Sequence, residues 1–122
     1  MSNPLRPRRF DLIAFDWDGT LADSTQAIAL SIQAACVDMG CPAPSLDAAR
    51  HVIGLGLREA MAYLVPGLPT SDYEQMIQRY RAHWLPRDPQ VALFPGSVAM
   101  LAQLAERGHM LAIATGKSSA GL

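Results

Sequence analysis

The sequence predicts an α/β fold in which an all-helical insertion interrupts a parallel-sheet core. Two short apolar runs, at residues 12–15 and 110–114, predict strands. Between them, apolar residues recur at helical spacing, and glycines and prolines separate the resulting segments. Because helices join the two strands, a parallel pair with a right-handed crossover is favoured. We therefore expect residues 1–24 and 90–122 to form a partial core and residues 25–89 to form an inserted helical cap.

The first strand is expected to be buried and to lead into a helix. Residues 12–15 read Leu-Ile-Ala-Phe, an apolar run typical of parallel strands that are covered on both faces. Gly19 then permits a sharp turn. Ser24 is a suitable N-cap for a helix that runs from residue 25 to about residue 39, and Gly40 is a suitable stop. Apolar residues at helical spacing mark the buried face of this helix: Ile28, Ile32, Ala35, Cys36 and Met39.

Two shorter helices are expected next, with a flexible loop between them. Ser45 is placed to start a helix that runs through His51. Gly54 and Gly56 then predict a loop. The following helix carries an apolar stripe and ends before a proline; the residues are Leu57, Met61, Leu64, Val65 and Pro66.

A longer helix is expected to complete the insertion. Ser71 followed by Glu74 matches a capping box, so Ser71 is expected to cap a helix that runs to Trp84. Tyr73, Tyr80 and Trp84 share one face of that helix. We assign this aromatic face to the core of the cap rather than to a base-stacking platform.

The final segment predicts a helix and a second buried strand. A Phe94-Pro95-Gly96 turn precedes an amphipathic helix that stops at Gly108. The strand at residues 110–114 follows at once, and Thr115 stands at its end. Because ligands of doubly wound folds gather beyond the carboxyl ends of parallel strands, the residues after both strands are the first candidates for a site.

Composition and charge exclude several classes of function. A formal net charge of −1 gives no overall attraction to nucleic acid or to an anionic membrane surface. No segment approaches the roughly 18 apolar residues that a membrane-spanning helix needs. Cys36 and Cys41 are too few for a disulfide framework and match no zinc spacing. The three histidines have no partner at metal-ligand spacing. We expect a cytoplasmic protein with reduced thiols and no nucleic-acid or membrane partner.

Asp16 and Asp18 are the strongest candidates for chemistry. Asp16 ends the first predicted strand and Asp18 follows closely, so both carboxylates can face the same mouth. One carboxylate can attack phosphorus while the other moves protons. Their crowded negative charge also favours a cation, and hard carboxylate oxygens together with a substrate phosphate suit Mg²⁺. Gly19 and Thr20 offer backbone N–H groups in a tight turn, of the kind that holds a phosphate.

The run Phe-Asp-Trp-Asp-Gly-Thr-Leu at residues 15–21 resembles the first motif of the haloacid-dehalogenase-like hydrolases. A fixed Asp-x-Asp-Gly-Thr arises by chance on the order of once in 10⁵ positions at ordinary residue usage. The resemblance implies a Rossmann-like core, incomplete in this chain, and hydrolysis of phosphate monoesters. It implies that Asp16 is the nucleophile that becomes a phosphoaspartate, and that Asp18 is first the general acid and then the base. It also implies Mg²⁺, held by the Asp16 side chain and the Asp18 backbone carbonyl.

The end of the second strand resembles the family's second motif, a Thr or Ser after an apolar strand. By this resemblance Thr115 hydrogen-bonds a phosphate oxygen, beside the amide of Gly116. The turn at residues 94–96 and the intervening helical cap resemble the phosphoglycolate-phosphatase-like branch. That resemblance implies a small phosphorylated metabolite as substrate, with 2-phosphoglycolate as the first guess. The loop that contains Gly54 and Arg58 resembles the substrate-specificity segment of the cap.

Two further motifs of the family do not occur in these 122 residues. One is a lysine that steadies the charge on phosphate and nucleophile, and the other is an acidic pair that completes the Mg²⁺ site. Lys117 follows the second motif at once and is a weak substitute for that lysine. Loss of one electrostatic stabiliser commonly costs about 10² to 10³ in rate. We therefore expect a chain that is truncated after the second motif and has little or no phosphatase activity by itself.

Three other functions are compatible with parts of the pattern. A phosphomutase of the same superfamily would share every residue named above, and product analysis would separate the two. A dehalogenase is disfavoured because it requires neither Asp18 nor magnesium. The chain could also be a non-catalytic remnant that binds a partner or forms a homodimer through its cap or an open sheet edge.

Overall fold

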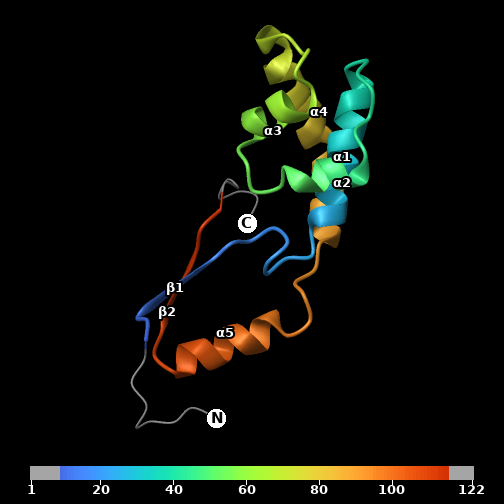
Figure 1. Ribbon diagram of the computed structural model, residues 1–122. Helices are drawn as coiled ribbons and strands as arrows, with labels where there is room; N and C mark the ends of the chain where they lie inside the picture. Colours follow the sequence, from blue (N-terminus) through green and yellow to red (C-terminus); the bar gives the residue numbers. More distant parts are fainter. Residues whose placement is uncertain (1–8, 116–122) are drawn as a thin grey trace.

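The computed structural model of the protein describes residues 9–115. Its sheet consists of two parallel strands, β1 (Leu12–Phe15) and β2 (Met110–Ile113). Helix α5 (Ser97–Glu106) comes directly before β2 and packs against it. Figure 1 shows these three elements together at one end of the molecule. The predicted parallel pairing is confirmed.

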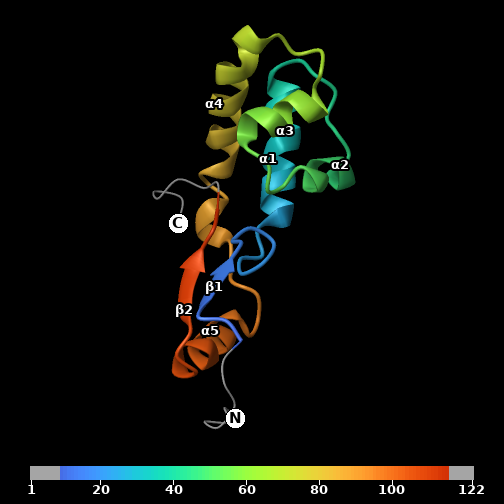
Figure 2. The same ribbon diagram turned by 60° about the vertical axis from the view of Figure 1, so that its left-hand side comes forward.

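Four α-helices form a bundle beyond the end of the sheet, and we call residues 25–84 the helical unit. The helices are α1 (Thr25–Asp38), α2 (Leu46–His51), α3 (Leu57–Leu64) and α4 (Tyr73–Trp84). Short 3-10 turns, η1 (Thr70–Asp72) and η2 (Asp88–Gln90), flank α4. Helix α1 packs against α2 and α4, and α3 also contacts α4. Figure 2 shows the arrows of both strands pointing toward this bundle. No helix within residues 9–115 is long and apolar enough to cross a membrane.

The buried core lies in the helical unit. Ile32, Ala35 and Cys36 of α1 are at most 2% exposed. Met61 of α3 and Met76 of α4 are fully buried and belong to the same cluster. The helical spacing of the α1 residues places them on one stripe, which faces the neighbouring helices. The apolar face predicted for this helix is therefore confirmed.

The prediction that both strands are buried is wrong. Leu12 of β1 is 55% exposed and Met110 of β2 is 69% exposed. Burial of a parallel strand requires covering layers on both faces of the sheet. Within residues 9–115 the sheet has two strands, and α5 packs on β2. The apolar runs identified the strands correctly, but their burial depends on layers that this part of the chain does not supply.

The serines predicted as helix caps behave differently from one another. Ser45 precedes α2 and accepts a hydrogen bond from the Ala48 amide at 3.1 Å, so this cap is confirmed. Ser24 precedes α1, but its side chain makes no capping bond. The capping box at Ser71 is wrong, because Ser71 lies inside the 3-10 turn η1 and Asp72 stands at the N-cap position of α4. A tight turn before the helix thus shifts its start past the predicted cap.

Candidate active site

The carboxyl ends of β1 and β2 bring Asp16 and Thr115 to the same edge of the sheet. Phe15 pairs with Ile113 in parallel register. The Ala114 amide then donates to the Phe15 carbonyl at 2.7 Å, so the pairing continues past the last residue of β2. Figure 2 shows that this edge faces the helical unit. The structure therefore brings together the positions that follow the two predicted strands.

A tight loop after β1 carries Asp16 and Asp18. The Trp17 carbonyl accepts hydrogen bonds from the amides of Thr20, Leu21 and Ala22 at 3.2, 3.0 and 3.0 Å. Gly19 has a φ of +77°, a left-handed conformation that glycine adopts without the strain of a side chain. The loop is therefore closed by its own backbone and depends on glycine at this position.

The segment before α5 anchors this loop from behind. Leu21 and Ala22 are 2% and 1% exposed. The Leu21 carbonyl accepts hydrogen bonds from the Phe94 amide at 2.9 Å and from the Ser97 hydroxyl at 3.2 Å. Ser97 is itself buried. The Phe94-Pro95-Gly96 turn, which precedes α5, thus belongs to the structure that holds the two aspartates.

Both aspartate side chains are held by hydrogen bonds. Oδ1 of Asp16 accepts from the Trp17 amide at 2.8 Å. Oδ1 of Asp18 accepts from the Ser24 hydroxyl at 2.7 Å. From the sequence, Ser24 is expected only as a helix cap, so this contact is not predicted. The only sequence signal is the position of Ser24 between the loop and α1. That position is equally compatible with a helix cap and with a hydrogen bond to Asp18.

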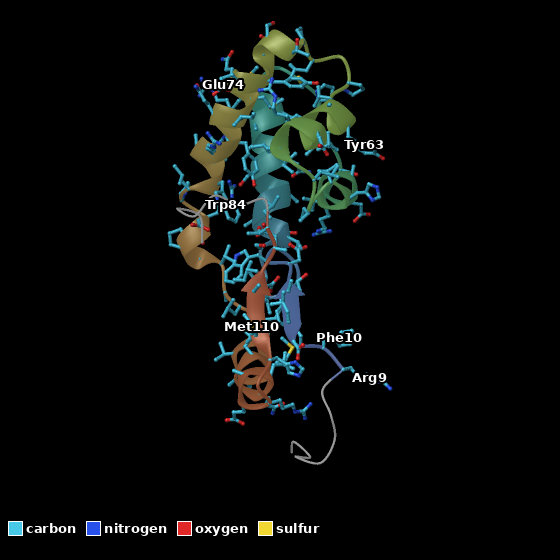
Figure 3. The ribbon with its side chains drawn as sticks, turned by 90° about the vertical axis from the view of Figure 1, so that its left-hand side faces the viewer. Arg9, Phe10, Tyr63, Glu74, Trp84 and Met110 are labelled. Carbon is cyan, nitrogen blue, oxygen red and sulfur yellow. The ribbon has the colours of Figure 1, made fainter. Side chains whose placement is uncertain are left out.

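A cavity of about 790 Å³ lies between the strand ends and the helical unit. Asp16, Asp18 and Thr115 line it from the core. The helical side contributes the α2–α3 loop, the second half of α4 and the residues that follow, among them Gly54, Gly56, Tyr80, Arg81, Trp84 and Asp88. In Figure 3, Trp84 lies near the strand ends, whereas Met110 and Phe10 lie at the opposite end of the sheet. The volume falls within the range of roughly 300–1,000 Å³ typical of small-molecule sites.

The contribution of α4 to the cavity was missed from the sequence. The aromatic face assigned to the cap core includes Tyr80 and Trp84, and Arg81 lies at its edge. Burial raises the pKa of Tyr80, and the carboxylates of Asp18 and Asp88 raise this pKa further. The phenol therefore stays protonated well into the alkaline range and can donate a hydrogen bond in the cavity wall. A core face and a cavity wall have the same apolar pattern, so spacing alone could not separate them.

The two residues predicted from the specificity segment lie in different places. Gly54 lines the cavity. Arg58 is exposed and does not line it; its guanidinium carbon lies 5.6 Å from the centre of the Tyr73 ring. This cation–π contact accounts for the position of Arg58. A contact between Arg58 and a substrate stays a prediction that this geometry does not support.

The predicted phosphate donors also differ in position. Thr115 lines the cavity, whereas Gly19 and Thr20 do not. The Gly19 amide donates to the Ala22 carbonyl at 2.9 Å, and the Thr20 amide is likewise used inside the loop. A phosphate contact from these two amides therefore stays a prediction. Residues 116 and 117, the predicted amide donor Gly116 and the candidate cation Lys117, lie outside the described residues.

Comparison with known proteins places this geometry in a family. The model of a family described as haloacid dehalogenase-like hydrolase matches residues 13–122. The chain belongs to this family. The match includes the loop of Asp16 and Asp18, the helical unit and Thr115, so the resemblance seen in the first motif extends over nearly all of the chain. For a haloacid dehalogenase-like hydrolase, a cavity at the strand ends is the natural candidate for the active site.

Several known proteins resemble the chain over much of its length. Tyrosine-protein kinase PtkA of Mycobacterium tuberculosis is 38% identical over 108 residues, which cover 88% of this chain and 36% of that protein. A phosphoglycolate phosphatase of Aliivibrio fischeri is 35% identical over 116 residues, covering 88% of this chain and 51% of that protein. The crystal structure of a hydrolase from Pseudomonas syringae superposes with a TM-score of 0.82 at 20% identity, over 90% of this chain and 52% of that one. The α/β fold is thereby shown, and the chain spans about half or less of these relatives.

The haloacid dehalogenase-like resemblance implies Mg²⁺, and the residues at the cavity fit this ion in part. Within residues 9–115 no group of three or more His, Cys, Asp or Glu side chains is placed to hold a metal ion. Mg²⁺, however, keeps several waters and commonly takes only one or two carboxylates together with substrate phosphate. Asp16 and Asp18 offer such oxygens in the cavity wall. The donor set is therefore compatible with part of a magnesium site.

Proposed function

We propose that the protein containing this chain is a Mg²⁺-dependent hydrolase of phosphate monoesters that acts through an aspartyl-phosphate intermediate on Asp16. The observation that carries this proposal is the cavity shared by Asp16, Asp18 and Thr115 beyond the carboxyl ends of two parallel strands. Family membership supports a hydrolase, and the phosphatase name of the Aliivibrio relative supports phosphate esters as its substrates.

In the first half-reaction, a carboxylate oxygen of Asp16 attacks phosphorus and the bond between phosphorus and the ester oxygen breaks. The leaving oxygen takes a proton from the carboxyl group of Asp18, so that a neutral alcohol departs. The hydrogen bond from the Trp17 amide orients the Asp16 carboxylate for this attack. The products are a phosphoaspartate, a free alcohol and an ionised Asp18.

In the second half-reaction, a water molecule attacks phosphorus and gives a proton to the Asp18 carboxylate. The bond between phosphorus and the Asp16 oxygen breaks, so inorganic phosphate leaves and the Asp16 carboxylate is restored. The bond from the Ser24 hydroxyl holds Asp18 in place. One residue can then serve as acid and base in turn without a change of rotamer.

Charge on the phosphate is the main electrostatic problem of this reaction. The Asp16 carboxylate and the Asp18 backbone carbonyl would hold Mg²⁺, which when bound offsets the charge of the phosphoryl oxygens. In this proposal the Thr115 hydroxyl, at the carboxyl end of the neighbouring strand β2, donates to a phosphate oxygen, with the Gly116 amide beside it. The amides of Gly19 and Thr20 could join them only after giving up their bonds within the loop.

The substrate proposed is a small phosphorylated metabolite. A cavity of about 790 Å³ accommodates such a molecule with room for water. The name of the Aliivibrio relative supports 2-phosphoglycolate as the first ester to test. In this proposal residues 25–89 act as a cap that covers the site, and the α2–α3 loop with α4 contacts the part of the substrate beyond its phosphate.

Two other phosphoryl transfers remain as candidates. The name of the mycobacterial relative supports transfer to a tyrosine hydroxyl. A phosphomutase would use the same aspartates and return the phosphoryl group to the substrate. The three reactions differ in their products, which are inorganic phosphate, phosphotyrosine and an isomeric phosphate ester. Product analysis by ³¹P NMR therefore separates them.

The test uses the protein expressed from its complete native reading frame, with 2-phosphoglycolate and Mg²⁺. We expect Asp16→Asn to lower kcat by about 10³-fold or more, because the amide cannot form the phosphoryl ester. Asp23→Asn is the matched control, since Asp23 is exposed beside the same loop and does not line the cavity. EDTA should abolish phosphate release, and added Mg²⁺ should restore it.

The possible outcomes have distinct meanings. Unchanged turnover in Asp16→Asn contradicts the proposed nucleophile. Equal loss in both variants points to general disruption of the loop, and the thermal melting temperatures then decide whether the fold is intact. Trapping of phosphate on a peptide that contains Asp16, found by mass spectrometry after acid quench, supports the intermediate directly.

A further inference from the structure

One positive charge stands out in the cavity wall. Among the described residues that line the cavity, Arg81 alone is cationic, whereas Asp16, Asp18 and Asp88 supply carboxylates. A phosphate ester that enters this space meets the acidic side chains of Asp16, Asp18 and Asp88. Coulomb repulsion between an ionised carboxylate and a phosphate group in one cavity is substantial when water is partly excluded. Arg81 therefore supplies a countercharge on the helical side that the core residues described here do not.

Arg81 lies on the cavity-facing side of α4. Trp84, three residues later on the helix, and Tyr80, the residue directly before Arg81, line the same cavity. Figure 3 shows Trp84 near the strand ends, at the end of the helical unit that is closest to the sheet. Arg81 stands one helical turn before Trp84, so it lies farther from the sheet than the two aspartates. A ligand with its phosphate at Asp16 would thus present its other end toward Arg81.

Arg81 also has no competing partner within residues 9–115, whereas three other arginines, Arg50, Arg58 and Arg87, each have one. Arg50 forms an ion pair with Asp47, and Arg58 lies over an aromatic ring. Arg87 donates to the His83 carbonyl at 2.9 Å. No ion pair, side-chain hydrogen bond or ring contact holds the Arg81 guanidinium among the described residues. Its five donors are available to a ligand.

We propose that Arg81 binds a second anionic group of the substrate, so that the enzyme selects phosphate monoesters that carry a further negative charge. A guanidinium suits this role because it binds planar oxyanions such as carboxylates through two parallel hydrogen bonds. This inference rests on the proposed phosphatase function and extends it to the class of ester. Arg81 acts on substrate selection and takes no part in the proton or phosphoryl transfers.

Another role for Arg81 predicts a different result. A cation in the last turn of a helix offsets the partial negative charge of the helix end, and Arg81 is in that turn of α4. That effect would stabilise the fold but would not depend on the charge of the substrate. Discrimination between two esters that differ in one charge therefore separates the two roles.

The kinetic test compares 2-phosphoglycolate with ethyl phosphate, which is similar in size but has no carboxylate, in the protein expressed from its complete reading frame. We expect Arg81→Gln to reduce the ratio of kcat/KM between the two esters by about tenfold or more, since a charge-assisted contact is lost. Arg81→Lys should recover part of the ratio. The control is Arg79→Gln, because Arg79 is exposed on the same helix outside the cavity wall and should leave the ratio unchanged.

A binding experiment keeps the inference testable if neither ester is turned over. Calorimetry with the Asp16→Asn variant measures the Kd of each ester without hydrolysis. Tighter binding of 2-phosphoglycolate, lost in the Asp16→Asn, Arg81→Gln double variant, supports the inference even where the proposed hydrolysis fails. Equal Kd values for the two esters, or an unchanged ratio in the double variant, overturn it. A drop in melting temperature with no change in the ratio likewise assigns Arg81 to the helix end alone.

Discussion

The Ser24 hydroxyl donates a hydrogen bond of 2.7 Å to Oδ1 of Asp18, and this bond ties the first helix to the proposed acid–base residue. Ser24 is 1% exposed, so water does not easily replace the donor if it is removed. Because Ser24 is also the residue directly before α1, the orientation of Asp18 depends on where that helix begins. The start of the helical unit therefore takes part in the geometry of the cavity.

Ser24→Ala should impair turnover more than it impairs folding. A hydrogen bond to a charged acceptor is worth about 1.5–3 kcal/mol, and its loss frees Asp18 to adopt other rotamers. We expect kcat for the phosphate ester to fall about tenfold or more while KM changes little. Steady-state kinetics on the protein from the complete reading frame, together with urea unfolding, measures both quantities.

Ser45→Ala is the matched control for this change. Its hydroxyl accepts from the Ala48 amide as the N-cap of α2, so removal should cost about 1 kcal/mol in the free energy of unfolding. Ser45 does not line the cavity, and kcat should stay at the wild-type value. If Ser24→Ala shows the same unchanged kcat as Ser45→Ala, the bond to Asp18 has no catalytic role.

Features that depend on neighbours in the chain were predictable from the sequence. The apolar runs located β1 and β2, and glycine at residue 40 marked the end of α1. The parallel register then required Asp16 and Thr115 to leave the sheet at one edge. Local propensity and the carboxyl-end rule for parallel sheets were sufficient for these features.

Features that arise from contacts between distant segments were not predictable. Arg81 faces the cavity because α4 packs on α1. Nothing in the local sequence distinguishes Arg81 from a surface arginine. Ser24 uses its hydroxyl for Asp18 because the loop before it folds back on itself. The exposure of Leu12 depends on which layers cover the sheet, which a strand's own residues do not determine.

Gly19→Ala should destabilise the loop that carries the aspartates. A Cβ at this position would lie 3.1 Å from Cγ2 of Thr25, and the φ of +77° is unfavourable for any residue with a side chain. The two effects together should lower the free energy of unfolding by about 1–3 kcal/mol and reduce kcat. Gly67→Ala is the control, since nothing lies within 4 Å of its Cβ position and its φ is not in the left-handed region. Equal unfolding free energies for the two variants in urea titrations would contradict the assigned role of Gly19.

Tyr80 should make stability depend on pH in the alkaline range. Burial, and then the carboxylates of Asp18 and Asp88, raise the pKa of Tyr80 in the folded protein, whereas an unfolded tyrosine has a pKa of about 10. Above that pH the unfolded chain loses a proton that the folded chain keeps, so the free energy of unfolding falls by up to about 1.4 kcal/mol per pH unit from this group.

Tyr80→Phe should remove the part of this alkaline decline in stability that comes from Tyr80. Tyr63→Phe is the control, because Tyr63 is 62% exposed and does not line the cavity. Urea unfolding at pH values above about 10 measures the slopes; a slope of Tyr80→Phe equal to that of the wild type would show that the phenol is not protected in the cavity wall.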